Sequence, residues 1–359
     1  MSTGRETVWA RARAADRARE VARALAADRA RDVDEAVETA ADVLDAATQV
    51  VLLGHVNPDA DSLGSALALG LALHRRGVQV MVSYGAAEPD ELPPESLRAL
   101  DVAGLLHRPS DVPEAPEVLV CCDTADRRRL GILADRVDAA ETTILVDHHA
   151  SNPGFGDVQV LDPTVEATVV LVHRILDLMD VDLDPAVGAC LYAGLATDTV
   201  GFRIGGPGPH RLAAELVEAG VEVEPLMRGL VDSHPFAWLH ALGAILQAAE
   251  LEPGLRAGHG LVHATVPRAV VEAFRPEEVE SVVDHVRTAT EAEVTAVLKQ
   301  VAGDRWTVSL RSRGAVDVAA AAVALGGGGH PRAAGFSRSG SRTEILAAIR
   351  TALGDTGRT

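Results

Sequence analysis

The chain has 359 residues, of which 47% are hydrophobic and 24% are charged, a profile of a folded globular protein with enough chain for two domains. Its formal charge is −19 at pH 7, and 3% of its residues are aromatic. Such an acidic surface excludes binding to long duplex nucleic acid, and so few aromatic side chains argue against an extended base-stacking platform. A small anionic substrate is still compatible if metal ions and a few arginines reverse the field locally.

The first 48 residues are rich in Ala, Arg, Glu and Asp, with apolar positions at helical spacing, and predict an amphipathic helical extension over 1–48. No apolar run reaches the length of a membrane span, and the first 30 residues lack the apolar core of a secretory signal. We therefore expect a cytoplasmic protein without a membrane partner. The cysteines, Cys121, Cys122 and Cys190, are expected to be buried thiols, because two of them are adjacent within an apolar strand.

From residue 49 onward, apolar runs alternate with stretches at helical spacing. Strands that are apolar throughout are typical of a parallel sheet covered on both faces. The pattern predicts an α/β domain over 49–230 built on a doubly wound, mainly parallel sheet. Its strands are expected at 49–54, 78–84, 117–123 and 142–149, and its helices at 62–76, 166–180, 185–197 and 208–220.

A smaller C-terminal α/β domain is expected at 257–359, after a helical linker at 231–256 that ends in a Pro-Gly turn. We expect the active site in the cleft between the two domains. The elements of the second domain are predicted as a strand at 260–267, helices over 268–290, a hairpin at 292–314 turning at Gly303-Asp304, a helix at 316–325, a loop at 326–330 and a helix at 342–353.

Acids and histidines follow three of the predicted strands and end one of the predicted helices. Because the carboxyl ends of parallel strands meet at one edge of a sheet, the three strand-end clusters should lie together there, and the fourth must reach the same edge. Any one cluster could be a helix cap or a structurally satisfied histidine, but four together favour a set of ligands. The stretches are "GHVNPDAD" at 54–61, "CCDTAD" at 121–126, "VDHHASN" at 146–152 and "LATDTVGF" at 195–202.

Carboxylates gathered this closely would repel one another and raise their pKa values, an effect that a bound divalent cation removes. The donors are carboxylate oxygen and imidazole nitrogen without thiolate, a set that suits Mn²⁺, with Mg²⁺, Co²⁺ or Fe²⁺ as alternatives. Two such ions about 3.5–4 Å apart would share a carboxylate and activate a bridging water or hydroxide for in-line attack on phosphorus.

The four stretches, together with "LGGGGHPRAAGF" at 325–336, resemble the successive motifs of the DHH phosphoesterases and of their associated C-terminal domain. The resemblance covers the chain from about residue 48 to its end, and the two-domain length is similar to the bacterial oligoribonuclease and 3′-phosphoadenosine 5′-phosphate phosphatase branch. It implies hydrolysis of short RNA (nanoRNA) to mononucleotides and of 3′-phosphoadenosine 5′-phosphate to AMP, and in some lineages of linear or cyclic di-adenylate. A homodimer is compatible with this resemblance.

The resemblance also implies roles for individual side chains of the first domain. His149 would face the substrate phosphate, and Asp147 would orient the two histidines. The family's "TDTGSF" reads "TDTVGF" here, which keeps Asp198 but leaves the backbone path after it open. Six side chains would hold two Mn²⁺ ions: His55, Asp59 and Asp123 for one, and Asp61, His148 and Asp198 for the other, with Asp123 bridging.

The second domain is expected to hold the far end of the substrate. Glycines let backbone amides approach a phosphate closely, and Arg311 can grip a terminal phosphate bidentately. The alternative is a flexible turn before an Ala-rich segment. The substrate-binding residues implied are Arg311, Gly327, Gly328, Gly329 and His330.

Three other functions are compatible with parts of this pattern. A manganese-dependent inorganic pyrophosphatase shares the first-domain motifs, but that family has a different second domain without the glycine-rich loop. A processive single-strand exonuclease would need more chain and a basic groove. A nucleotide sensor with a decayed site is disfavoured by the intact ligand set.

Overall fold

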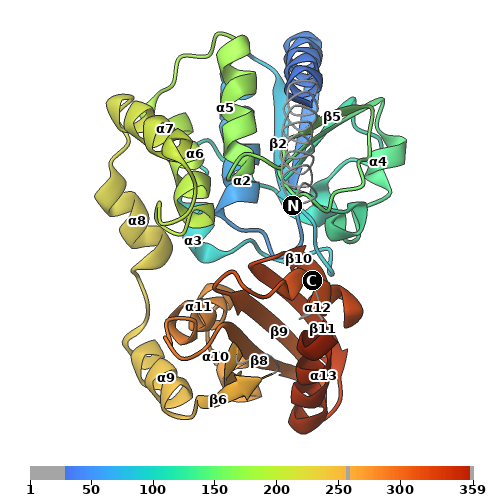
Figure 1. The fold of residues 1–359 in the computed structure, drawn as a ribbon. Coiled ribbons are helices and arrows are strands. Elements are labelled where there is room, and N and C mark those ends of the chain that lie inside the picture. The colour runs from blue at the N-terminus through green and yellow to red at the C-terminus, as the bar shows by residue number, and fades with distance from the viewer. Residues whose placement is uncertain (1–28, 256–258, 356–359) are drawn as a thin grey trace, which may run out of the picture. The chain divides into compact units, whose positions relative to one another are not determined.

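The computed structural model describes residues 29–255 and 259–355, and within these ranges no helix is long and apolar enough to cross a membrane. The chain divides into two compact units, Met1–Met227 and Arg228–Thr359, each with its own sheet (Figure 1). Of the predicted N-terminal extension, residues 29–46 form a helix, while residues 1–28 lie outside the described part of the chain.

Unit 1 contains a five-stranded sheet in the order β2-β1-β3-β4-β5, in which every neighbouring pair is parallel. This confirms the predicted α/β fold. Four strands match the predictions, whereas β5 was not predicted, because four residues at a sheet edge carry too short an apolar run. The strands are β1 (Gln49–Gly54), β2 (Gln79–Tyr84), β3 (Val118–Cys122), β4 (Thr142–Asp147) and β5 (Val158–Leu161).

The helices of unit 1 cover the sheet, and α2 packs tightly against α6 through glycines. A Cβ atom at Gly64 would lie 2.4 Å from the carbonyl oxygen of Cys190, so only glycine permits this approach. All three cysteines are free and buried, as predicted. The helices are α2 (Ala60–Arg75), α3 (Glu95–Arg98), η1 (Pro109–Asp111), η2 (Arg127–Leu130), α4 (Arg136–Ala139), α5 (Thr168–Leu178), α6 (Pro185–Asp198) and α7 (Pro207–Glu218), followed by α8 (Val223–Val231), which crosses the boundary between the units. Of these, α2, α5, α6 and α7 match the predictions, whereas α3, η1, η2, α4 and α8 were not predicted.

The strand order places a topological switch point between β1 and β3. The chain leaves β1 toward β2 on one side and leaves β3 toward β4 on the other, so a gap opens beyond the carboxyl ends of these two strands. Ligands of open α/β sheets bind at such a gap. The two polar clusters at 54–61 and 121–126 both begin there.

Unit 2 contains a six-stranded sheet in the order β10-β11-β9-β8-β7-β6, in which β7 and β8 are parallel and the other pairs antiparallel. One face packs against α12 and α13, and the other against α9, α10 and α11. The elements are α9 (Phe236–Gln247), β6 (Glu250–Leu255), β7 (His259–Val266), α10 (Arg268–Ala273), α11 (Pro276–Val286), β8 (Val294–Ala302), β9 (Arg305–Ser312), α12 (Val318–Ala324), β10 (Gly328–His330), β11 (Ala333–Ser339) and α13 (Arg342–Asp355).

Two predictions for this part of the chain were wrong. The helical linker ends at Gln247, and the expected Pro-Gly turn lies inside β6, an edge strand whose register with β7 shifts between Glu252 and Leu255. An edge strand tolerates proline at such an irregularity. The expected loop at 326–330 contains β10, which pairs with the unpredicted β11.

Candidate metal centre

The first cluster follows β1 directly. His55 is buried, and Asp59 caps α2 by accepting the Ser62 N–H at 2.9 Å. Asp61 lies in the first turn of α2 but does not cap it, because its fully buried carboxylate accepts the amides of Thr168 at 2.7 Å and Val169 at 3.0 Å instead. These two N–H groups begin α5, where the helix dipole also favours a negative charge.

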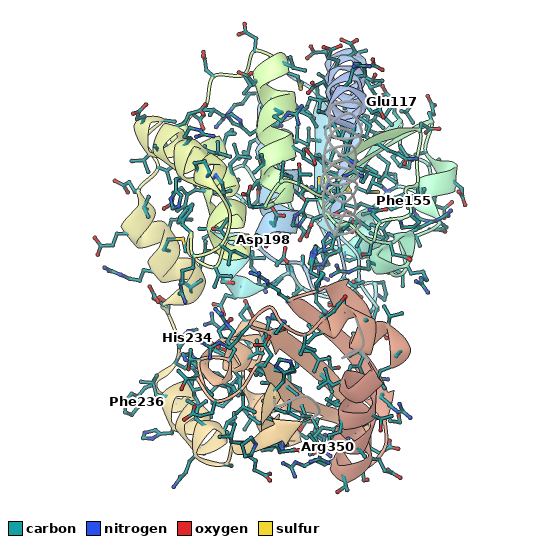
Figure 2. All side chains as sticks on the ribbon, in the orientation of Figure 1. Glu117, Phe155, Asp198, His234, Phe236 and Arg350 are labelled. Carbon is teal, nitrogen blue, oxygen red and sulfur yellow. The ribbon has the colours of Figure 1, made fainter. Side chains whose placement is uncertain are left out.

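The other three clusters meet the first one in unit 1. Asp123 follows β3 in the left-handed region at φ 55°, Asp147 ends β4, and His148 and His149 come immediately after it. Asp198 ends α6 (Figure 2). The structure therefore brings together all eight residues predicted for the first domain.

Asp123 occupies the middle of the cluster. Its Oδ2 atom lies 3.2 Å from Nε2 of His55, and its Oδ1 atom lies 3.6 Å from Nε2 of His148. The ligand atoms of His55, Asp59 and Asp123 lie within 4.8 Å of one another, and so do those of the group Asp61, Asp123 and His148. Asp123 thus belongs to both groups and turns one oxygen toward each.

His148 connects the second group to the end of α6. Its Nε2 atom lies 3.3 Å from Oδ2 of Asp198 and 3.9 Å from Oδ2 of Asp61. Asp61 is inaccessible to solvent, whereas the Asp198 side chain is 27% exposed. The second group therefore has a buried side and a side open to solvent.

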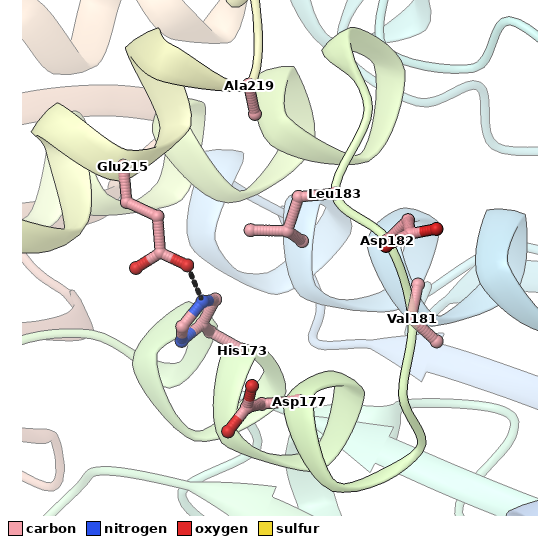
Figure 3. A pocket seen from close by; sticks show the side chains of 7 residues that line it. All are labelled: His173, Asp177, Val181, Asp182, Leu183, Glu215 and Ala219. Carbon is pink, nitrogen blue, oxygen red and sulfur yellow. Dashed lines mark hydrogen bonds and ion pairs between the residues drawn. The ribbon is translucent and has the colours of Figure 1, made fainter.

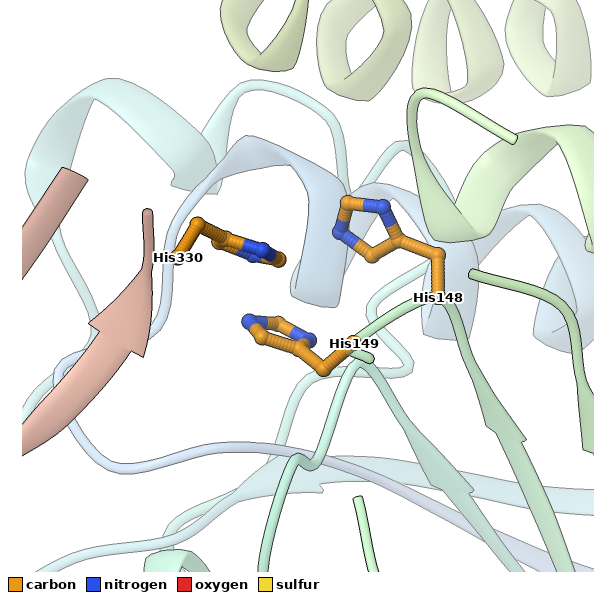
Figure 4. A group of neighbouring side chains, drawn as sticks. All are labelled: His148, His149 and His330. Carbon is orange, nitrogen blue, oxygen red and sulfur yellow. The ribbon is translucent and has the colours of Figure 1, made fainter. Parts of the chain in front are cut away.

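Asp147, which immediately precedes the two histidines, holds the ring of His149. Its Nδ1–H donates to Oδ1 of Asp147 at 2.7 Å, and Asn152 donates to the other carboxylate oxygen at 2.6 Å. These hydrogen bonds outweigh the effect of burial and lower the pKa of Asp147. The rings of His148 and His149 meet edge to face with centroids 4.9 Å apart (Figure 4).

The pKa values of the cluster show that its carboxylates compete for positive charge. Burial, Asp198 and Asp123 raise the pKa of Asp61 well above its usual value, and burial with nearby carboxylates raises that of Asp198 to about 6. Burial opposes the charged form of His55 and His148, but the neighbouring aspartates raise the pKa of each to about 10.

Divalent cations fit this arrangement. They would replace the shared protons, and the donors are hard oxygens and imidazole nitrogens already within reach of one another. The buried acidic and histidine cluster is thus able to hold metal.

Two groups at the site were missed by the sequence reasoning. Thr168 donates its hydroxyl to Oδ1 of Asp123 at 3.0 Å, and Asn152 fixes Asp147 as described above. Asn152 lies in the quoted motif "VDHHASN", so its proximity was available from the sequence. Thr168 follows an unremarkable "EA", and only the position of α5 reveals its contact.

Four of the five predicted substrate-binding residues lie on the sheet of unit 2, and the fifth, Gly327, immediately precedes β10. Strand pairing aligns Arg311 with Ala333 and Ala333 with His330, so Arg311 and His330 project from the same face. Among the described residues, the guanidinium of Arg311 has one hydrogen-bond partner, the Leu310 carbonyl at 3.0 Å. Its other donors remain available to an anion.

The glycines of this segment differ in what they permit. A Cβ atom at Gly327 would lie 2.0 Å from the Gly335 carbonyl oxygen, and one at Gly329 would lie 2.5 Å from that of Ala333. The close approach of β11 to this segment therefore explains both glycines. Gly328, like Gly326, has open space where a side chain would begin, so a ligand can approach its backbone.

A separate hollow of about 210 Å³ lies in unit 1 between α5 and α7 (Figure 3). His173 contacts Glu215 there at 3.1 Å, and the lining also includes Asp177 and Asp182. It contains none of the predicted site residues, and its acidic lining disfavours a phosphate.

Comparison with known proteins identifies both units. Residues 49–195 match the model of the DHH family, N-terminal domain, and residues 262–355 match that of the DHHA1 domain. The bifunctional oligoribonuclease and PAP phosphatase NrnA of Thermus thermophilus is 31% identical over 327 residues, which cover 89% of this chain and 95% of that protein. The probable bifunctional oligoribonuclease and PAP phosphatase NrnA of Streptococcus mutans is 23% identical, over 84% of this chain and 93% of that protein.

A solved structure supports the fold. The exopolyphosphatase-related protein from Bacteroides fragilis superimposes with a TM-score of 0.79 at 20% sequence identity, over 90% of this chain and 96% of its own. The two domain matches and the 31% identical relative show that the chain belongs to the DHH family, as a phosphoesterase that carries a DHHA1 domain.

Proposed function

We propose that the protein is a manganese-dependent phosphoesterase that hydrolyses short oligoribonucleotides to mononucleotides and 3′-phosphoadenosine 5′-phosphate to AMP, with linear and cyclic di-adenylate as further candidate substrates. The observation that carries the proposal is the placement of Asp123 between the His55 and His148 groups, with one oxygen toward each. A shared carboxylate is the feature by which two metal ions act together on one phosphate.

Six side chains would hold the two ions, and Mg²⁺ or Co²⁺ would suit the same donors. When bound, the ions would neutralise the substrate phosphate and supply an activated water. His149 would meet a phosphate oxygen through Nε2, since Nδ1 is engaged with Asp147. The ligand residues are His55, Asp59 and Asp123 on one side, and Asp61, His148, Asp198 and the shared Asp123 on the other.

We assign substrate binding in unit 2 to Arg311, Gly328 and His330. The available donors of Arg311 and the open backbone of Gly328 support this assignment. Gly327 and Gly329 would shape the loop rather than contact the ligand. Gripping the far end of a substrate would favour short chains over long ones. A cytoplasmic location and a homodimer remain predictions that accompany this function.

A manganese-dependent inorganic pyrophosphatase is the main alternative. The match of residues 262–355 to the DHHA1 domain argues against it, because that domain occupies the part in which the pyrophosphatases differ. A nucleotide sensor is a weaker alternative, since the cluster keeps every predicted ligand.

The test is a product profile. The protein with added Mn²⁺ is incubated with RNAs of two to ten nucleotides, 3′-phosphoadenosine 5′-phosphate, di-adenylates and pyrophosphate, with a chelator control. We expect mononucleotides from the shortest RNAs and AMP from 3′-phosphoadenosine 5′-phosphate. Release of phosphate from pyrophosphate alone would favour the pyrophosphatase, and no metal-dependent turnover of any substrate would favour the sensor.

A further inference from the structure

Three consecutive arginines, Arg127, Arg128 and Arg129, follow β3 close to the metal centre, and they differ in how they are engaged. Arg127 makes two hydrogen bonds to the carboxylate of Asp138, and Arg128 makes two to that of Asp126. The half-buried Arg129 side chain has no hydrogen bond or ion pair with any residue that the structure describes. Its charge is thus left available in a chain that carries 52 acidic residues against 33 Lys and Arg.

The backbone of Arg129 is fixed to the loop that carries His55. Val56 donates its N–H to the Arg129 carbonyl at 2.7 Å, so the residue after the first metal-ligand candidate is bound directly to Arg129. On the other side, a Cβ atom at Gly85 would lie 2.3 Å from the same carbonyl oxygen. The backbone of Arg129 therefore contacts both the loop that follows β1 and the loop that follows β2.

The charge of Arg129 reaches the metal centre. After burial and their mutual contact, which dominate the pKa values of His55 and Asp59, the Arg129 guanidinium lowers the pKa of both. Arg129 makes no ion pair with Asp59 or Asp123, so neither carboxylate occupies the donors of its guanidinium. An arginine held near a metal centre without a carboxylate partner is suited to an anionic ligand.

We propose that Arg129 binds a phosphate oxygen of the substrate beside the His55–Asp59 side of the centre, and so acts as a substrate-positioning residue within unit 1. This proposal rests on the proposed function and adds to it a phosphate contact outside the DHHA1 domain. Its planar guanidinium would hold two oxygens of one phosphate, and the fixed backbone would reduce the entropy lost on binding.

The test compares Arg129→Gln with Arg128→Gln, whose arginine is exposed and paired with Asp126. Binding of AMP to the Mn²⁺-loaded protein is measured by calorimetry, and KM and kcat are measured on a dinucleotide RNA. We expect Arg129→Gln to weaken AMP binding and raise KM by about 10–100-fold, the usual loss for a hydrogen-bonded charge, with a smaller change in kcat. Arg128→Gln should match the wild type, and Arg129→Lys should recover part of the binding.

A structural role would give a different pattern. If Arg129 served only to hold the loop, Arg129→Gln would lower the melting temperature or the Mn²⁺ affinity while the protein that remains folded bound AMP normally, and this result would overturn the proposal. Equal AMP affinity in Arg129→Gln and the wild type would also overturn it, without affecting the proposed function. If the wild type neither binds AMP nor hydrolyses RNA, the proposed function fails, and the role of Arg129 fails with it.

Discussion

The carboxylate of Asp147 holds His149 by one oxygen and Asn152 by the other, with donor distances of 2.7 Å and 2.6 Å. Asp147 is inaccessible to solvent, so it cannot contact a substrate itself. Its position instead fixes the orientation of the His149 ring and places the proton on the nitrogen that faces Asp147.

The substitution Asp147→Asn should therefore reduce kcat without unfolding the protein. An amide cannot accept two hydrogen bonds through equivalent oxygens, so the His149 ring would lose its fixed tautomer and orientation. We expect kcat on a dinucleotide RNA to fall by about 10–100-fold. Asp138→Asn, an exposed acid that pairs with Arg127, is the matched control and should behave as the wild type. Full activity of Asp147→Asn would show that His149 needs no orienting partner.

Replacing the central carboxylate should have the largest effect. Asp123→Ala removes the oxygens that face His55 and His148, and no other described side chain belongs to both ligand groups in this way. We expect no measurable hydrolysis and a lower Mn²⁺ content by elemental analysis than in the wild type. Substantial residual activity in Asp123→Ala would contradict the bridging arrangement.

Metal binding should be coupled to proton release. In the metal-free protein the pKa values of His55 and His148 are raised to about 10, so both imidazoles are protonated at pH 7, and that of Asp198 is raised to about 6. The histidine contacts therefore stabilise the metal-free fold fully below the unfolded pKa of about 6.5, and this contribution is lost as the pH rises toward 10. A metal ion binds only the deprotonated imidazoles and carboxylates, so metal binding favours loss of the protons that the metal-free protein holds.

Affinity for Mn²⁺ should consequently rise between about pH 6 and pH 8, with protons released into the buffer. Calorimetric titrations at one pH in two buffers of different ionisation enthalpy measure the number released. Identical heats in both buffers would show that no proton leaves, and the proposed ligands would then not be those that bind the metal.

In unit 2, Arg311→Ala should weaken substrate binding more than catalysis. Burial lowers the pKa of Arg311, while Asp284 and Glu280 help to keep it charged. The sheet therefore presents a positively charged guanidinium that can bind a phosphate. We expect KM for short RNA to rise by about 10–100-fold with little change in kcat. Arg305→Ala, at the exposed start of the same strand, is the control. An unchanged KM would remove Arg311 from substrate binding.

The sequence predicted the parts of the structure that have strong local signals. The three central strands of unit 1, β1, β3 and β4, are apolar on both faces, and the acids and histidines after these strands follow from the geometry of a parallel sheet. The short edge strands β5, β6 and β10 were missed or misassigned, because their pairing is decided by neighbours distant in sequence rather than by their own residues. The same reason hid the contact of Thr168 with Asp123, which depends on where α5 begins.

The segment after Asp198 carries backbone strain that the sequence alone left open. Val200 has a φ of 53°, followed by Gly201 at 66° and Phe202 at 62°, so a β-branched residue occupies the left-handed region that glycine prefers. The related motif "TDTGSF" has glycine at the position of Val200. The turn is held by the Thr199 hydroxyl, which accepts the Phe202 N–H at 3.0 Å, and by the Gly201 N–H, which donates to the Ala196 carbonyl at 2.7 Å.

Val200→Gly should therefore stabilise the protein. Relief of the left-handed conformation stabilises the folded state by about 1–2 kcal/mol, while the extra conformational freedom of glycine in the unfolded chain destabilises it by about 0.5–1 kcal/mol. We expect the free energy of unfolding to rise by up to about 1.5 kcal/mol in urea titrations. Val217→Gly, at an exposed position in the last turn of α7 without such strain, should instead be destabilised, since glycine has a low helix propensity. If Val200→Gly loses as much stability as Val217→Gly, the turn does not strain Val200. If Val200→Gly keeps wild-type activity, the strain plays no part in placing Asp198.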